Sequence, residues 1–267
     1  MSKVRIAVAG AAGRMGRTLI RAIVADPACA LAGAIEASGH PDLGADCGTL
    51  SGHGHSGILV TDDALTALSN ADALIDFTRP SVSLLLTALV AETHIVHVIG
   101  TTGFSSEEEN AIAAASRRCV IVKSGNMSMG VTLLAALVAR AAKALPDYDV
   151  EILEMHHRMK ADAPSGTALL LGEAAARGRA VGLEREAGRN GLTGPRKPGT
   201  IGFASLRGGT VVGEHEVILA GPHERIVLGH IAEDRAIFAQ GAVAAAKWGR
   251  SQEPGLYGMA DVLGVAG

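Results

Sequence analysis

A dense group of ionisable side chains lies between residues 154 and 167, in the run Glu-Met-His-His-Arg-Met-Lys-Ala-Asp-Ala-Pro-Ser-Gly-Thr. A histidine can donate or accept a proton near neutral pH. Cations and the amides at a helix N-terminus can bind carboxylates. These residue types suit a reductase of a small dicarboxylate, in which cations hold the substrate and an acid protonates the anion left by hydride addition.

Two other interpretations of this segment stay open. It could be a solvated basic loop in front of a capped helix, since surface charges usually serve no ligand. A metal site is the weaker alternative, because adjacent histidines on a strand face opposite sides and no cysteine or third histidine at helical spacing completes a ligand set. We therefore expect no bound metal.

Three glycines could form a second chemical site near the N-terminus. Gly10, Gly13 and Gly16 follow a run of β-formers at 4–9 and precede a helical pattern at 18–25. Glycines let the backbone approach a pyrophosphate, and the helix N-terminus supplies N–H groups and positive potential. The spacing G-x-x-G-x-x-G is one residue longer than the usual dinucleotide pattern, so a role in packing alone remains the alternative.

Glu36 strengthens the dinucleotide interpretation. It ends the next strand-like run, 30–35, about 20 residues beyond the turn, where an acidic residue commonly binds the adenosine ribose. Its carboxylate would repel a 2′-phosphate, and Ala37 follows it in place of an arginine. Arg14, inside the turn, is the nearby cation. We therefore expect NADH to be preferred and NADPH to be tolerated.

Strand-like and helical patterns alternate through the first half of the chain, which predicts an α/β fold with a Rossmann-like, doubly wound parallel sheet. Ser105 or Ser106 is expected to cap a helix with three glutamates in its first turn. The other expected elements are strands at 4–9, 30–35, 58–60, 73–77, 95–99 and 120–122 and helices at 18–25 and 81–91.

The pattern changes after residue 127, where consecutive strand-like runs with short turns predict a smaller α+β domain with a mixed or antiparallel sheet. We expect a dinucleotide-binding domain at 1–127, with the C-terminal helix and its continuation, 236–267, packing back on it, and a substrate-binding domain at 128–235. The expected elements are helices at 131–145, 165–176 and 236–247, strands at 150–155, 200–206, 211–219 and 225–230, and a long loop at 177–199.

Composition excludes several classes of protein. Hydrophobic residues make up 48% of the chain and aromatic residues 3%, and the formal net charge is −3. The hydrophobic residues suffice for a core. The few aromatic residues leave little for stacking on bases, and the negative net charge gives no basic surface field, so we expect no nucleic-acid partner. We expect no signal peptide and no membrane span, because no apolar stretch is long enough. Three scattered cysteines suit a reduced, cytoplasmic protein.

Several segments, in order along nearly the whole chain, resemble the 4-hydroxy-tetrahydrodipicolinate reductase family, formerly dihydrodipicolinate reductase, of bacterial lysine and diaminopimelate synthesis. The run His-His-Arg-x-Lys-x-Asp-x-Pro-Ser-Gly-Thr is highly specific to that family. The matching segments are residues 8–16, 76–80, 100–104, 154–167, 198–203 and 212–215.

The resemblance implies a role for each matching residue. His156 would be the proton donor or acceptor and Lys160 a second proton donor. His157, Gly166 and Thr167 would bind the substrate carboxylates. The implied cofactor contacts are Gly10, Ala11, Ala12, Gly13, Arg14, Met15, Glu36, Gly100, Thr101, Thr102, Ser124, Gly125, Asn126 and Met127.

The resemblance also implies a reaction and an assembly. NADH or NADPH would reduce 4-hydroxy-tetrahydrodipicolinate to tetrahydrodipicolinate, with hydride added to ring carbon 4. The second domain would also carry the contacts of a homotetramer. One departure is Met127, where many relatives carry an aromatic residue, so the packing beside the nicotinamide is expected to differ.

Two rival functions remain. Another two-domain nicotinamide dehydrogenase is one, although aldehyde oxidation by covalent catalysis needs a poised cysteine that the sequence does not indicate. A dinucleotide-sensing protein without catalysis is the other, and it would leave the cluster at 154–167 unexplained. Spectroscopic detection of reduced-nicotinamide consumption, with and without the dicarboxylate, separates the three functions.

Overall fold

The computed structural model describes residues 2–266, which form two compact units. The first unit comprises residues 2–128 and 236–264, and the second comprises residues 129–235 with 265–266. Among the described residues, none of the helices combines the length and apolar character that a membrane crossing requires.

The first unit contains a seven-stranded sheet in which every pairing is parallel. Strands of four residues or more in this sheet are rich in Val, Ile and Ala, as expected for strands that are buried on both faces. The strands are β1 (Val4–Ala9), β2 (Cys29–Ile35), β3 (Val60–Thr61), β4 (Ala73–Asp76), β5 (Val96–Ile99), β6 (Val120–Lys123) and β12 (Gly255–Tyr257). They lie in the order β12-β6-β5-β4-β1-β2-β3.

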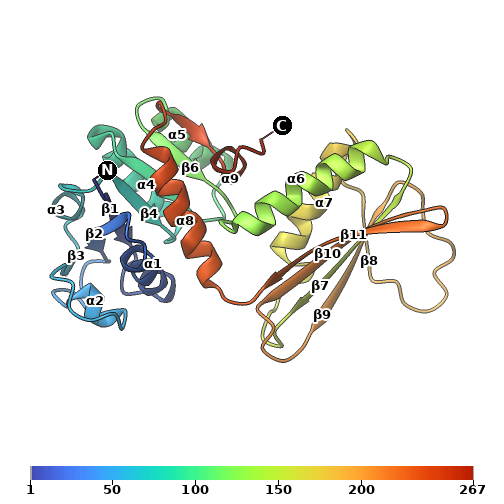
Figure 1. Ribbon diagram of the computed structural model, residues 1–267, viewed down its shortest axis with the longest axis horizontal. Coiled ribbons are helices and arrows are strands. Elements are labelled where there is room, and N and C mark those ends of the chain that lie inside the picture. The colour runs from blue at the N-terminus through green and yellow to red at the C-terminus, as the bar shows by residue number, and fades with distance from the viewer. Residues whose placement is uncertain (1, 267) are drawn as a thin grey trace. The chain divides into compact units, whose positions relative to one another are not determined.

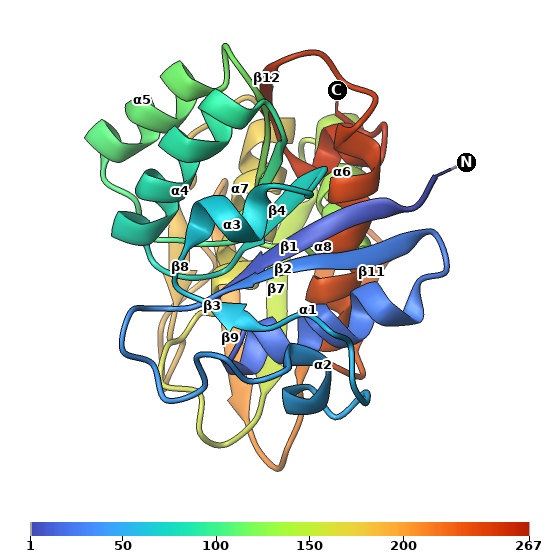
Figure 2. The same ribbon diagram turned by 90° about the vertical axis from the view of Figure 1, so that its left-hand side faces the viewer.

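Helices cover both faces of this sheet. The helices of the first unit are α1 (Arg14–Ala25), α2 (Cys47–Leu50), α3 (Ala64–Leu68), α4 (Pro80–Thr93), α5 (Ser106–Ala115), α8 (Ala236–Gly249) and α9 (Met259–Val262). Figure 2 shows α1 and α8 on one side of the sheet and α4 and α5 on the other. Each side has its own core, with Leu19 and Val243 in one and Leu86 and Ile112 in the other. The doubly wound parallel sheet predicted from the sequence is therefore confirmed.

The second unit contains a five-stranded mixed sheet, as predicted. Its strands are β7 (Asp149–His156), β8 (Arg185–Ala187), β9 (Ile201–Arg207), β10 (Gly213–Gly221) and β11 (Glu224–Ala232), in the order β11-β10-β7-β9-β8. Strand β10 is antiparallel to both of its neighbours, whereas β7, β9 and β8 run parallel. Helices α6 (Met129–Ala144) and α7 (Gly166–Gly178) lie side by side on one face of this sheet (Figure 1).

The alternation of β7 positions chemistry on the helix-covered face. Val150 and Ile152 point into the core beneath α6 and α7, and the same alternation places Glu154 and His156 on that face at the end of the strand. The first half of β7 therefore contributes apolar side chains to the core, and its last residues place polar side chains on the same face.

Several short elements were missed or misplaced by the sequence analysis. Strand β8 lies inside the segment 177–199 that was predicted as a loop, and β12, α2, α3 and α9 were not predicted. These elements have three to five residues, too few for a period to show, and the pairing partners of the strands are distant in sequence. The strand predicted at 58–60 is the two-residue β3, and α1 begins four residues before the predicted start because its first turn carries few apolar residues.

Candidate functional site

The glycine turn between β1 and α1 is shaped by close backbone contacts. Gly10 has a φ of +67°, and a Cβ added at Gly16 would lie 2.1 Å from the Gly10 carbonyl oxygen. Gly13 is the N-cap of α1 and offers no side-chain cap to the amides of the first turn. A helix start of this kind, reached by a tight glycine turn, fits the pyrophosphate of a dinucleotide.

Glu36, directly after β2, is held against this turn. One carboxylate oxygen accepts from the Ala12 amide at 3.1 Å, and the other accepts from the Ala37 amide at 3.0 Å. The turn also has a cation that the sequence analysis did not name. Arg17 donates from Nε to the Ala12 carbonyl at 2.8 Å and forms an ion pair with Asp42 at 3.2 Å. The predicted cation, Arg14, is exposed.

The loop after β5 lies at the same carboxyl edge of the parallel sheet as the glycine turn. Gly100 is required there because a Cβ would lie 2.3 Å from the Phe77 ring. Thr101 is buried, and its Oγ1 accepts from Ser83 Oγ at 2.9 Å. Thr102 is exposed. Ligands of doubly wound sheets bind at this edge, outside the carboxyl ends of the strands.

The segment after β6 belongs to the same edge. The Ser124 amide donates to the Ile99 carbonyl at 3.1 Å, and Ser124 Oγ donates to the Asn126 carbonyl at 2.7 Å. Gly125 is exposed, whereas Met127 is 1% exposed and packs in the core with α8. The structure thus brings the other proposed cofactor contacts to one edge and buries the side chain of Met127.

In the second unit a buried carboxylate orients His156. Glu154 is 1% exposed, and its Oε2 lies 2.6 Å from His156 Nδ1. Arg207 donates to both Glu154 oxygens at 2.8 Å, and the Ser165 amide donates to Oε1 at 3.2 Å. Burial raises the pKa of Glu154, but hydrogen bonds from Arg207, Ser205 and His156 outweigh it and lower this pKa to about 2.

A permanently charged Glu154 fixes the tautomer of His156. The carboxylate can only accept, so Nδ1 carries the hydrogen and Nε2 is the nitrogen left for chemistry. Burial lowers the pKa of His156, and Glu154 opposes this effect. A Cβ at Gly213 would lie 3.0 Å from His156 Nε2, so a glycine at that position keeps the reactive nitrogen uncrowded.

A second histidine, His215, joins this cluster to helix α7. Ser165 caps α7 by accepting from the Ala168 amide at 3.1 Å, so its hydroxyl hydrogen is directed to His215 Nε2 at 2.9 Å. The rings of His215 and His156 meet edge to face, with centroids 5.1 Å apart. Burial, aided by the charge of His156, lowers the pKa of His215 to about 4.

The other predicted substrate residues lie beside this cluster, in the same unit. Lys160 Nζ contacts both Asp162 oxygens, at 2.8 and 3.0 Å, and His157 Nε2 lies 3.1 Å from Arg235 Nη2. Gly166, at the first turn of α7, is exposed and Thr167 is half-buried. Among residues 2–266, no group of three or more His, Cys, Asp or Glu side chains is arranged to hold a metal ion.

Glu154, Arg207 and His215 belong to the site, although none of them was predicted as a site residue. Glu154 lies two residues before His156 on a strand, and that spacing alone could have shown that the two share a face. Arg207 and His215 come from β9 and β10, and only the register of these strands against β7 brings them to Glu154.

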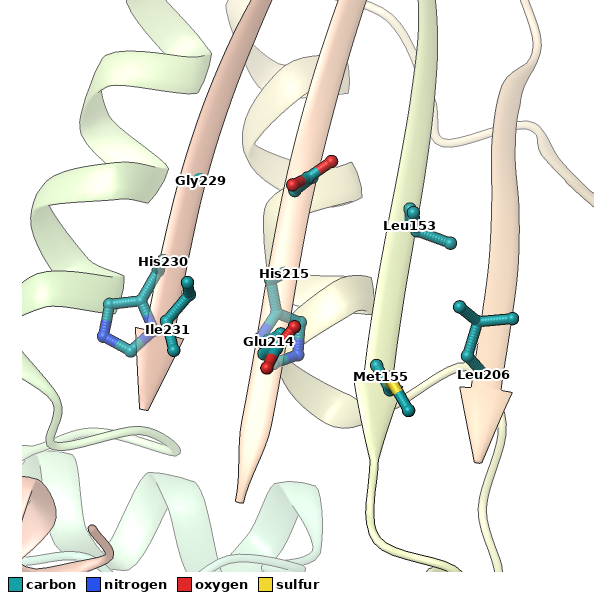
Figure 3. A pocket seen from close by; sticks show the side chains of 9 residues that line it. Leu153, Met155, Leu206, Glu214, His215, Gly229, His230 and Ile231 are labelled. Carbon is teal, nitrogen blue, oxygen red and sulfur yellow. The ribbon is translucent and has the colours of Figure 1, made fainter. Parts of the chain in front are cut away.

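A pocket of about 450 Å³ lies on four strands of the same sheet, β7, β9, β10 and β11. Figure 3 shows Leu153 and Met155 of β7 beside Leu206 of β9, with Glu214 on the neighbouring β10. Leu153 and Met155 alternate with the core residues of β7, so they face away from α6 and α7. None of the predicted site residues lines this pocket.

Comparison with known proteins decides the family. A family model described as "Dihydrodipicolinate reductase, N-terminus" matches residues 4–127, and one described as "Dihydrodipicolinate reductase, C-terminus" matches residues 130–263. The chain belongs to the dihydrodipicolinate reductase family. As a dihydrodipicolinate reductase family member it is an oxidoreductase, and its Rossmann-type fold implies a nicotinamide dinucleotide cofactor.

Curated relatives in this reductase family match the chain over its whole length. The 4-hydroxy-tetrahydrodipicolinate reductase of Parvibaculum lavamentivorans is 61% identical over 98% of this chain and 98% of its own. The enzyme of the same name from Beijerinckia indica is 58% identical over 100% of both chains.

Solved structures share the fold. A dipicolinate-bound dihydrodipicolinate reductase from Paenisporosarcina sp. superimposes with a TM-score of 0.78 at 22% identity, covering 96% of this chain and 97% of that one. An amine dehydrogenase from Mycobacterium smegmatis gives a TM-score of 0.60 at 15% identity, covering 96% and 94%. The fold is therefore shared with dehydrogenases beyond the dihydrodipicolinate reductase family.

Proposed function

We propose that the chain catalyses the NADH- or NADPH-dependent reduction of 4-hydroxy-tetrahydrodipicolinate to tetrahydrodipicolinate, in the diaminopimelate route to lysine. The observation that carries the proposal is the His156 imidazole, held by a buried Glu154 carboxylate at 2.6 Å with Nε2 left for chemistry. That arrangement occurs in a chain whose relatives carry the name of this reductase.

The two domains expected from the sequence bind different ligands: residues 1–127 with 236–267 bind the dinucleotide, and residues 128–235 bind the substrate. The first unit of the structure, residues 2–128 with 236–264, corresponds to the first of these domains. The glycine turn accepts the pyrophosphate, Glu36 the adenosine ribose, and the loops after β5 and β6 the remainder of the cofactor. The support is that these segments follow neighbouring parallel strands and therefore share one edge of the sheet.

His156 and Lys160 act as proton donors in this mechanism. A dihydronicotinamide held at the carboxyl edge of the parallel sheet would supply the hydride that reduces ring carbon 4 of the substrate. His156 protonates the neighbouring carbon, directly or through a water that it positions, while Glu154 holds Nδ1 and stabilises the charged imidazole. Lys160 acts as a second proton donor and assists the loss of water from the hydroxylated ring. Asp162, its present partner at 2.8 Å, orients the ammonium.

The substrate carboxylates bind to His157, Lys160 and the backbone at Gly166 and Thr167. The N-terminus of α7 favours an anion because its dipole and amides point there. Ser165 fixes this helix start by capping it. The site therefore presents a cation and a helix N-terminus, one for each carboxylate of a diacid.

NADH is the preferred cofactor in this proposal. A 2′-phosphate would approach the Glu36 carboxylate, and Arg17 is engaged with the Ala12 carbonyl and Asp42. The test is the ratio of kcat/KM for NADH to that for NADPH, with a value above one expected. A strong preference for NADPH would contradict it.

The reaction itself is tested by following NADH oxidation with substrate freshly generated by the preceding synthase. Oxidation that depends on this substrate supports the proposal. Oxidation with another substrate alone would favour a different dehydrogenase. Binding of NADH without any turnover would favour a dinucleotide sensor.

We also propose a cytoplasmic homotetramer assembled through the sheet of the second unit. The sheet exposes apolar side chains, including Leu206 at 49% and Ile231 at 68%, which line the pocket of Figure 3, and Val227 at 50% on β11. Light scattering should give about four times the chain mass of 27.2 kDa. A particle with the mass of one chain would exclude the tetramer.

A further inference from the structure

A polar cluster is fully buried beneath α4 in the first unit, and the proposed reaction does not use it. Asp76 ends β4, His97 lies on the adjacent β5, and both are 0% exposed. Asp76 Oδ2 and His97 Nε2 lie 3.7 Å apart. Neither atom has a hydrogen-bond partner among the described residues, and the two atoms face each other.

The neighbours of His97 determine its proton arrangement. Its Nδ1 lies 3.2 Å from Thr87 Oγ1, and the Thr87 hydroxyl donates to the Ser83 carbonyl at 2.7 Å. The shorter contact of the Thr87 hydroxyl with the Ser83 carbonyl favours a donor role for Nδ1 toward Thr87, and Nε2 is then the ring nitrogen that faces the Asp76 carboxylate.

Asp76 is the acidic partner of this pair. Burial raises the pKa of Asp76, but interactions with His97, Ser83 and Thr78 outweigh burial and hold this pKa below its usual value. His97 is the basic residue that faces this carboxylate, with Nε2 at 3.7 Å from Oδ2.

The other oxygen of Asp76 holds the loops that follow β4 and β5. Oδ1 accepts from the Thr78 amide at 2.8 Å, from Thr78 Oγ1 at 2.6 Å and from Thr101 Oγ1 at 3.5 Å. Thr78 also abuts the glycine turn, since a Cβ at Gly10 would lie 3.2 Å from its methyl carbon. One carboxylate thus connects three segments of the carboxyl edge.

We propose that Asp76 and His97 are positioning residues of the dinucleotide site, acting as a buried carboxylate–imidazole pair that fixes Thr78 and Thr101 against the glycine turn. This inference rests on the proposed function, because it requires a dinucleotide at that edge. Both side chains are fully buried, so they act through the two threonines. Removing His97 takes away the group that faces the buried Asp76 carboxylate, which then moves or takes up a proton.

The test is the dissociation constant of NADH, measured by titration calorimetry without turnover. His97→Leu should weaken NADH binding about tenfold, which corresponds to about 1.4 kcal/mol. His97→Gln, which keeps a donor toward Asp76, should restore most of the affinity. Binding of pyridine-2,6-dicarboxylate, which probes the second unit, should stay at the wild-type value in both variants.

The outcomes separate this inference from the proposed function. If the wild-type chain binds neither NADH nor NADPH, the proposed function fails. If the wild-type chain binds NADH and folded His97→Leu binds it equally well, only the positioning role fails. If His97→Leu does not fold, Thr101→Val decides: weaker NADH binding than in Thr101→Ser supports the inference, and equal binding overturns it.

Discussion

Glu154 decides which nitrogen of His156 can exchange a proton with a substrate. Its carboxylate accepts hydrogen bonds from Arg207 Nη1 and Nη2 and from the Ser165 amide, so it cannot follow the imidazole if the ring turns. The ring is therefore held with Nε2 directed toward Gly213. Orientation of this kind lowers the barrier of a proton transfer because the acid is already in place.

Substitution of His156 tests its role as the acid. His156→Gln should lower kcat by roughly 10²–10⁴, the range for losing a positioned acid or base. The dissociation constant of NADH should not change, because the glycine turn and Glu36 are intact. Stopped-flow and steady-state kinetics measure both quantities, and near wild-type turnover would exclude the role.

Substitution of Glu154 tests the orienting carboxylate separately. Glu154→Gln removes the charge that raises the pKa of His156, so the alkaline limb of the kcat/KM profile should move to lower pH. It also leaves Arg207 without its ionic partner, so kcat should fall by about tenfold or more, or at least 1.4 kcal/mol. An unchanged pH profile in a folded variant would show that Glu154 is only structural.

The lowered pKa of buried His215 predicts that acid destabilises the second unit. The pKa of His215 is about 4 when folded, against about 6.5 in an unfolded chain, so the folded state binds fewer protons. Stability is then complete above pH 6.5 and is lost as the pH falls through 4, by up to about 3 kcal/mol. Urea unfolding at pH 7 and 4.5 should show a smaller loss for His215→Gln than for the wild-type chain. The exposed His53→Gln serves as control, and an equal loss in all three proteins would refute this account.

At the scale of elements, the N-terminus of α7 combines a stabilising cap with the proposed site for a substrate carboxylate. Ser165→Ala should cost about 2–4 kcal/mol, because it removes a cap and leaves buried His215 Nε2 unpaired. Ser105→Ala, at the exposed capping box of α5, should cost only about 1 kcal/mol. Thermal unfolding compares the two caps. Equal losses would mean that the contact with His215 contributes nothing.

Elements with a strong local pattern were predictable from the sequence. The strand β1 and a serine cap of α5, at Ser105 or Ser106, were predicted, and the structure has β1 and a cap at Ser105, since each depends on residues adjacent in the chain. Strands β8 and β12 were not predictable, because three-residue segments become strands only by pairing with β9 and β6. Tertiary pairing, which no local window contains, defines them.

The same division holds within the candidate site. His156 and Lys160 were identified because they lie in one run of sequence. Arg207 and His215 lie about fifty residues away and reach Glu154 only through the register of a mixed sheet. The Asp76–His97 pair similarly depends on the parallel pairing of β4 with β5.

For the whole molecule, two units with separate cores predict separate responses to two ligands. NADH at one hundred times its dissociation constant should stabilise the unit that binds it by about 2.7 kcal/mol, which slows exchange through unfolding about one hundredfold. Hydrogen exchange with mass spectrometry should show this protection in peptides around residues 10–16 and 100–102. Pyridine-2,6-dicarboxylate should instead protect peptides that cover residues 156–168. Protection by NADH confined to residues 129–235 would contradict the assignment of the two units, because the glycine turn would then not be the dinucleotide site.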